Sequence, residues 1–170
     1  YGGMPSLLDW LLGPPKSNPK ELCAKFCEAV GAGVGGDNNT PSQERARKQL
    51  FKIRRMMDSG CRDDSLAMLR AAANKDFTTA LFRSLPVLDF ETRKQAMSLF
   101  CALVSMKTGG GANPMVDMLA DNPGLLCDSL LRDGRGELTF TCGMMLRECL
   151  RHERLCRVVL SMDSLQVLFE

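Results

Sequence analysis

Histidine, aromatic residues and long apolar runs are all scarce in this 170-residue chain. His152 is the only histidine, and aromatics make up 6% of the residues. The longest strongly apolar stretch, Gln95 to Met106, is well short of the roughly 20 residues that a membrane-spanning helix needs, so we expect no membrane span. Near the N-terminus no basic region precedes an apolar one, and Asp9 interrupts the apolar residues, which predicts a chain without a signal peptide.

Neither sign of charge dominates. The 22 basic and 20 acidic residues leave a net charge of +2, which is too balanced to indicate a nucleic-acid-binding protein or attraction to an anionic membrane. The segment from Arg45 to Arg55 is locally basic, and Leu50, Phe51 and Ile53 interrupt it. We interpret it as the solvated face of a helix above an apolar stripe. The alternative is a docking surface for an acidic partner or nucleic acid.

The residue spacings that metal and catalytic sites require are missing. The eight cysteines include no C-x2-C pair, and Cys142, Cys149 and Cys156 recur every seven residues, near one helix face. Cys149 and His152 have no oriented third group beside them, as a catalytic pair would need. We therefore expect no catalytic residue, no metal and no cofactor. The thiols are expected to be buried and reduced, in a cytoplasmic protein.

Glycine and proline punctuation divides a Leu-, Ala- and Met-rich chain into short helical segments. No segment alternates with period two, so we predict an all-α fold. Residues 1–17 are predicted to be a tail with a short amphipathic segment. Residues 18–170 are predicted to be the first repeats of a longer solenoid, with flexible glycine-rich loops at 31–39 and 107–112. Helices are predicted at residues 18–30, 40–58, 63–74, 76–85, from 89 until the glycines at 109–111, 113–121, 122–132, 137–152 and from 153 towards 170, the last broken near 161.

A faint internal repeat suggests how these helices are organised. Ala96 to Phe100 aligns with Cys142 to Leu146, and the apolar positions that follow align at the same offset. Such a spacing lies in the range of armadillo and HEAT repeats, in which each helical unit buries its apolar face on its neighbours. An irregular helical bundle is the alternative. Phe90 is predicted to belong to the apolar face that also contains Met97 and Phe100.

Two segments resemble the calcium-binding protein 39 family. Thr141 to Glu153, with the sequence TCGMMLRECLRHE, resembles the signature helix of that family. Leu88 to Lys94, with the sequence LDFETRK, resembles an earlier landmark, and the order and separation of the two segments agree. The resemblance implies an armadillo-like, right-handed superhelix of three-helix repeats, without enzymatic activity.

The resemblance also implies a function in signal transduction. Members of the family are scaffolds that bind and activate sterile-20-type kinases or a related pseudokinase, in cell polarity and morphogenesis. The expected partner is therefore a protein kinase or pseudokinase and not a nucleic acid. An adaptor for a non-kinase partner, cytoskeletal or polarity-related, is the alternative. Calcium binding has no support in these residues.

The signature segment divides into an apolar and a polar face. The apolar face is predicted to be buried, and Gly143 is predicted to admit a neighbouring helix at close range. The polar face supplies the candidate partner contacts, which are Arg147, Glu148, Arg151 and Arg154. Because a solenoid cut between repeats exposes apolar surface, we also expect self-association through the C-terminal face. The residues expected there are Leu160, Leu165, Val167, Leu168 and Phe169.

Overall fold

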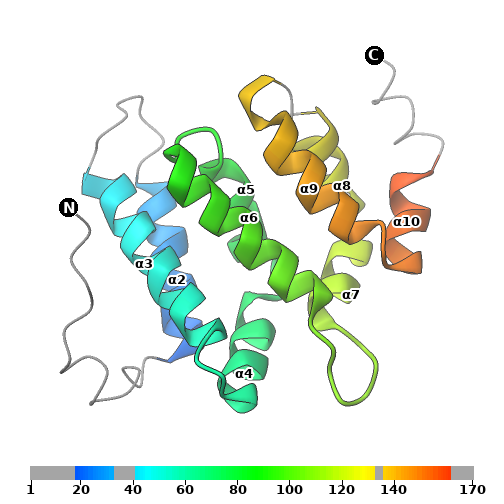
Figure 1. The fold of residues 1–170 in the computed structure, drawn as a ribbon. Helices are drawn as coiled ribbons and strands as arrows, with labels where there is room; N and C mark the ends of the chain where they lie inside the picture. The colour runs from blue at the N-terminus through cyan, green and yellow to red at the C-terminus, as the bar shows by residue number, and fades with distance from the viewer. Residues whose placement is uncertain (1–17, 33–40, 133–135, 162–170) are drawn as a thin grey trace.

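A computed structural model describes residues 18–32, 41–132 and 136–161, and every regular element in those ranges is helical (Figure 1). The predicted tail at 1–17 and most of the first glycine-rich loop lie outside the described residues. The elements are α2 (Pro19–Gly31), α3 (Pro41–Met57), α4 (Arg62–Ala72), α5 (Lys75–Ser84), α6 (Phe90–Ser105), α7 (Pro114–Asp121), α8 (Pro123–Leu126), the π-helical η1 (Cys127–Arg132), the 3-10 helix η2 (Gly136–Leu138), α9 (Thr139–Cys149) and α10 (Glu153–Val159). None of the described helices is long and apolar enough to cross a bilayer.

Capping residues fix where several helices begin. The side chains of Asn18, Asn74, Asp89 and Asn113 accept hydrogen bonds from backbone N–H groups in the first turns of α2, α5, α6 and α7. These bonds satisfy donors that have no partner inside the helix. After α3, Gly60 adopts a φ of 74°, in the left-handed region that favours glycine. The predicted helix starts at these points are confirmed to within two residues.

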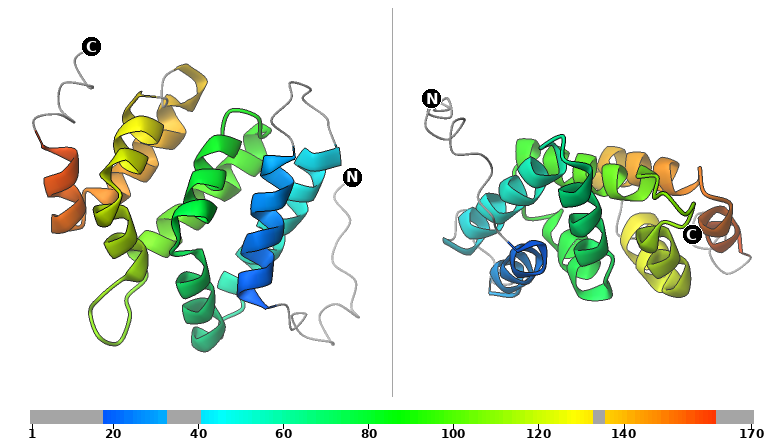
Figure 2. Two further views of the ribbon diagram at one scale, coloured as in Figure 1. Left: turned by 180° about the vertical axis from the view of Figure 1, so that it is seen from behind. Right: turned by 90° about the horizontal axis from the view of Figure 1, so that it is seen from below.

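The helices form two layers (Figures 1 and 2). α3, α6 and α9 lie side by side in one layer, and α2, α5 and α8 lie behind them. α6 packs against both α3 and α9. Arg54 Nη1 donates to Ser98 Oγ at 2.9 Å across the first contact, and Cys101 Sγ lies 3.9 Å from the Met144 carbonyl oxygen across the second.

The layers arise from a repeated unit. α4–α6 and α7–α9 each place short helices before a longer third helix. The positions aligned from the sequence agree with this, because Ala96 and Cys142 are both buried, as are Leu103 and Cys149. The predicted all-α helical-repeat fold is therefore confirmed.

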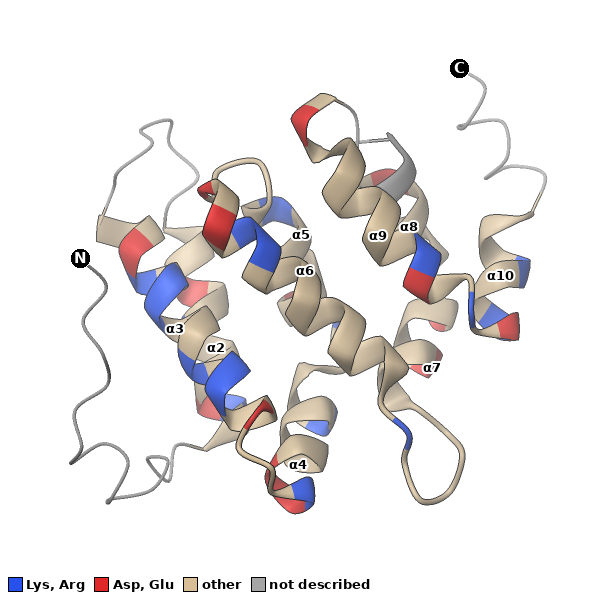
Figure 3. Cartoon of the chain, in the orientation of Figure 1, with Lys and Arg blue, Asp and Glu red and all other residues tan. Residues whose placement is uncertain are grey.

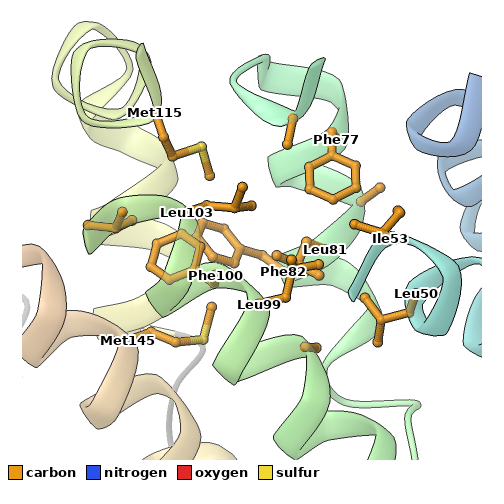
Figure 4. Packing of buried hydrophobic residues seen from close by; sticks show 14 of the residues in the cluster. Leu50, Ile53, Phe77, Leu81, Phe82, Leu99, Phe100, Leu103, Met115 and Met145 are labelled. Atoms are coloured by element: carbon orange, nitrogen blue, oxygen red, sulfur yellow. The ribbon is translucent and has the colours of Figure 1, made fainter. Parts of the chain in front are cut away.

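One continuous apolar core runs through these units (Figure 4). Two tilted aromatic pairs lie in it, with ring centroids 5.5 Å apart for Phe26 and Phe77 and 5.4 Å apart for Phe82 and Phe100. The first pair joins α2 to α5, and the second joins α5 to α6. Truncating such a buried phenylalanine to alanine costs about 3–5 kcal/mol.

Two predicted helices differ from the structure. The helix expected at 122–132 is a four-residue turn, α8, followed by the π-helical η1. The helix expected at 137–152 begins as the 3-10 helix η2 and ends at Cys149, since the chain turns there and His152 takes an extended conformation before α10. The spacing of apolar residues indicates an apolar face, but it does not distinguish an α-helix from a 3-10 helix or a π-helix.

Candidate partner-binding surface

The signature segment forms α9 and the turn into α10. Cys142, Met145 and Cys149 are buried against the core, as predicted, and Leu146 is partly buried. Gly143 lies on the opposite, exposed side, where an added Cβ would meet nothing within 4 Å. The expectation that Gly143 admits a closely packed helix is therefore wrong, because none of the described helices covers that face of α9.

The four candidate contact residues divide into two groups. Arg147 is exposed on α9, and no hydrogen bond or ion pair restrains it among the described residues. Arg151 Nη1 donates to Glu148 Oε2 at 3.3 Å, and the Glu148 side chain is only 13% exposed. Arg154 instead reaches back from α10 to α7 and forms ion pairs there. Arg147 and Arg151 are thus the candidates best placed to meet a partner, whereas Arg154 joins two helices of the chain itself.

Arg154 makes a two-pronged contact with α7. Its Nη1 donates to Asp117 Oδ1 and its Nη2 lies 3.3 Å from Asp121 Oδ1. Asp117 and Asp121 lie 37 and 33 residues earlier in the chain than Arg154. All three side chains remain substantially exposed, so the contribution to stability is that of surface pairs.

A cavity of about 810 Å³ lies between the α9–α10 turn and the α6–α7 loop. Glu148, Arg151 and Arg154 line one side, and Lys107 and Thr108 line the other. His152 also lies on this wall, at the N-terminus of α10, and its side chain makes no capping hydrogen bond. The cavity places three of the predicted residues together and leaves Arg147 outside it.

Sequence reasoning missed three exposed aromatic side chains. Phe51 is 57% exposed, Phe90 is 66% exposed and Phe140 is 68% exposed. They lie on α3, α6 and α9, which are neighbours in one layer. Phe90 was predicted to belong to the buried face of its helix, and that prediction is wrong because Asp89 starts the helix with Phe90 turned to solvent. For Phe51 and Phe90 the available signal was an aromatic residue inside a charged helical run, whereas the neighbours of Phe140 are uncharged.

The described residues give no support for a metal or catalytic centre. No group of three or more His, Cys, Asp or Glu side chains in these ranges could hold a metal ion. All eight cysteines are free; most are buried or partly buried, but Cys61 is exposed, against expectation. Burial raises the pKa of the Cys23 and Cys149 thiols to about 12, so both stay protonated at neutral pH.

The predicted self-association surface is only partly described. Leu160 is 53% exposed at the end of α10, and Leu150 is 39% exposed nearby. The other residues of that prediction, Leu165, Val167, Leu168 and Phe169, lie outside the described residues. Self-association through this end stays a prediction.

Comparison with known proteins adds evidence from outside the chain. A family model described as Mo25-like matches residues 12–170. The degreening-related gene dee76 protein of Auxenochlorella protothecoides is 31% identical over 112 residues, covering 66% of this chain and 35% of that protein. MO25-like protein 2 of Caenorhabditis elegans is 35% identical over 96 residues, covering 56% of this chain and 28% of that protein. Human calcium-binding protein 39-like is 29% identical over 90 residues, covering 53% of this chain and 26% of that protein.

These similarities cover most of this chain but only part of each relative. Both segments that carry the resemblance, 88–94 and 141–153, lie inside the range of the family model. The chain spans about a third or less of the length of these relatives.

Proposed function

Because the chain belongs to the Mo25-like family of helical scaffolds, we propose that it binds and activates a sterile-20-type kinase or a related pseudokinase. Under this proposal the chain catalyses no reaction itself and acts in cell polarity and morphogenesis signalling. The observation that carries the proposal is the family match over residues 12–170. The proposed setting is the cytoplasm, a reducing compartment in which eight free thiols persist.

The proposed contacts are the exposed arginines of α9 and of the turn that follows it. Arg147 is free to pair with a carboxylate of a partner, and Arg151 already holds Glu148 and would present that pair together. Guanidinium groups suit this role because they bind carboxylates in a planar, two-pronged geometry. Glu148 and Arg154 are proposed to position the turn, since both are engaged inside the chain.

We expect the double variant Arg147→Ala/Arg151→Ala to bind the kinase more weakly than the natural chain, by roughly fivefold to tenfold, as is typical of exposed interface charges. Calorimetry with a purified sterile-20-type kinase measures the affinity, and the phosphorylation rate of a kinase substrate measures activation. Arg70→Ala/Arg83→Ala is the matched control, because both residues are exposed arginines and lie on α4 and α5, not on α9 or the turn that follows it.

The same measurements on a full-length relative distinguish the outcomes. Activation by the longer protein alone would place the essential surface outside this chain. Equal affinity for the natural chain and the α9 variant would contradict the proposed contacts. Failure of both proteins to bind any sterile-20-type kinase would favour the adaptor for a non-kinase partner.

A further inference from the structure

A second cavity, of about 350 Å³, lies where α2 ends and α3 begins. Ala29 and Val30 line it from α2, and Ser42 and Ala46 line it from α3. The turn between α5 and α6 forms a further wall. None of its lining residues also lines the cavity beside the α9–α10 turn, so it is separate from the surface proposed to contact a kinase.

The cavity exists because small side chains face it. Ala29 and Ala46 are buried, and each contributes only a methyl group to the wall. Phe82 also lines the cavity and is held in the core by its tilted contact with Phe100. An apolar void leaves the side chains around it without contact partners on one side, and such voids accept small apolar molecules. The volume lies in the range of small-molecule sites.

Hydrogen bonds hold the turn that forms the further wall. Arg93 Nε donates to the Leu85 carbonyl oxygen at 3.0 Å, and its Nη2 donates to the Leu88 carbonyl oxygen at 3.1 Å. The N–H groups of Val87 and Leu88 both donate to the Ser84 carbonyl oxygen. Because these backbone groups already have partners, the turn presents apolar side chains to the cavity in a conformation that is fixed without a ligand.

The cavity has a single charged lining residue, Arg83, at the end of α5. Its side chain is exposed and makes no hydrogen bond or ion pair with another described residue. The Ser42 hydroxyl and the Gln43 amide, which also have no partner among the described residues, add neutral donors from α3. This set of donors suits one carboxylate, which a guanidinium binds through charge-assisted hydrogen bonds.

No carboxylate of the described residues lines this cavity. Acidic residues lie at the starts of α3 and α6 (Figure 3), but they are engaged elsewhere. Glu44 pairs with Lys48 at 2.8 Å, and Asp89 accepts hydrogen bonds from the hydroxyl and N–H of Thr92. The guanidinium of Arg83 is therefore left to attract an anion from outside the chain.

We propose that this cavity binds a small aliphatic monocarboxylic acid, whose chain fills the apolar space and whose carboxylate pairs with Arg83. A non-hydrogen atom with its hydrogens takes up roughly 30 Å³, as water does in the liquid, so the cavity holds about 12 such atoms. Decanoate matches that size. A phosphate ester fits less well, because it brings a second negative charge to a site with one cation. The proposal does not depend on kinase binding.

Calorimetric titration of the chain with decanoate tests the chemistry of the ligand. 1-Decanol has the same chain without the charge, decylammonium reverses the charge, and butanoate keeps the carboxylate but fills little of the space. All titrations stay below the concentrations at which these molecules aggregate. We expect decanoate to bind at least about tenfold more tightly than each of the other three, because the charge and the chain are both recognised.

A charge variant tests the location of the carboxylate. Arg83→Gln should weaken binding of decanoate by about tenfold and change the affinity for 1-decanol less than about twofold. Arg70→Gln is the matched control, because Arg70 is an exposed arginine of α4 that does not line the cavity. It should change neither affinity by more than about twofold.

Two further variants test the apolar space. Ala29→Leu fills part of the cavity and should weaken binding of both decanoate and 1-decanol by at least about fivefold. Val87 lines the cavity at a partly exposed position, so a substitution there leaves the core intact. Val87→Asp sets a carboxylate beside the cavity and should weaken decanoate by about fivefold but 1-decanol by less than about twofold. Circular dichroism melts verify that all variants fold.

Three results would overturn the proposal. The first is no saturable binding of decanoate up to about 1 mM. The second is binding of 1-decanol as tight as that of decanoate, which would show that the site does not recognise a carboxylate. The third is an equal loss of decanoate affinity in Arg83→Gln and Arg70→Gln, which would place the binding elsewhere. Because no kinase takes part, a negative result here leaves the test of kinase binding unaffected.

Discussion

Asn113 is a single side chain that caps two helices. Its Nδ2 donates to the carbonyl oxygens of Leu103, Val104 and Met106 at the end of α6, at 2.9 Å each. Its Oδ1 accepts from the backbone N–H groups of Met115 and Val116 at the start of α7, at 2.8 and 3.2 Å. The residue is buried, so water cannot replace these bonds.

We expect Asn113→Ala to lower the free energy of unfolding by about 2–3 kcal/mol, since it leaves helix ends without partners in a buried place. Asn113→Asp keeps the acceptor for α7 but loses the donors for α6 and sets a negative charge at the negative end of that helix. Both variants should therefore be clearly destabilised in urea denaturation at neutral pH. Asn18→Ala, which removes an exposed cap, is the control and should cost only about 1 kcal/mol. Equal losses at the two positions would contradict the double role.

At the scale of the helix, the start of α6 depends on an ionised carboxylate. The Thr92 hydroxyl and N–H both donate to Asp89, at 2.6 and 3.0 Å, and hold the pKa of that carboxyl below its ordinary value. A depressed folded-state pKa means that the charged form stabilises the fold above the unfolded pKa, near 3.8. This stability is lost as the pH falls through the folded-state pKa.

Asp89→Asn keeps an acceptor for the cap but cannot ionise. We expect it to lower the free energy of unfolding at neutral pH, by about 1 kcal/mol, and the difference from the natural chain to shrink on acidification below about pH 4. Urea denaturation across this pH range measures the difference. Glu91→Gln, at an exposed position of the same turn, controls for the loss of one negative charge. A difference independent of pH would show that the charge of Asp89 has no role.

The middle of α9 contains a glycine that the packing does not require. Gly143 is exposed, and an added Cβ would meet nothing within 4 Å. We expect Gly143→Ala to raise the free energy of unfolding by about 0.5–1 kcal/mol, since alanine loses less backbone entropy in a helix. Thermal unfolding would show a higher midpoint. Gly60→Ala is the contrasting variant and should destabilise, because its φ of 74° disfavours a side chain.

The sequence predicts a helix best where apolar residues recur at helical spacing and a capping residue marks the start of the helix. α2, α5, α6 and α7 start beside Asn or Asp caps, and those starts were found. The π-helical winding of η1 was missed because no side chain signals it. The exposure of Phe51 and Phe90 was also missed, since periodicity places an aromatic near an apolar stripe without showing whether a neighbouring helix covers it.

For the candidate contact residues, too, the sequence predicted local properties but not contacts between distant helices. The signature segment indicated which side chains are polar, and Arg147 and Arg151 are exposed in the structure. The engagement of Arg154 with Asp117 and Asp121 could not be predicted, because it joins helices of two different repeats.

At the scale of the whole molecule, these ion pairs attach α10 to the preceding unit. In a repeat protein each unit contacts only its neighbours, and α10 packs against α7 and α8 of the preceding unit. We expect Arg154→Met to speed amide hydrogen exchange in α10 while leaving exchange in α6 unchanged, with an effect below about 1 kcal/mol. Hydrogen-exchange mass spectrometry resolves the two helices. Arg157→Met, which breaks a pair inside α10 with Glu153, is the control. Equal acceleration in both variants would indicate fraying of α10 rather than detachment from α7.

Asn113 holds α6 and α7 together directly, so the loop between these two helices is not needed to fix their relative position. The end of α6 and the start of α7 are held by one side chain. The loop in between has local bonds of its own, from the Thr108 hydroxyl to the Ala112 carbonyl and from the Gly111 N–H to the Thr108 carbonyl. Loop length adds little to the free energy of closure, so residues 107–111 can be lengthened or replaced without moving either helix. The loop at residues 107–111 is thus a suitable insertion point, where a tag or a new recognition loop can be added while the scaffold stays unchanged.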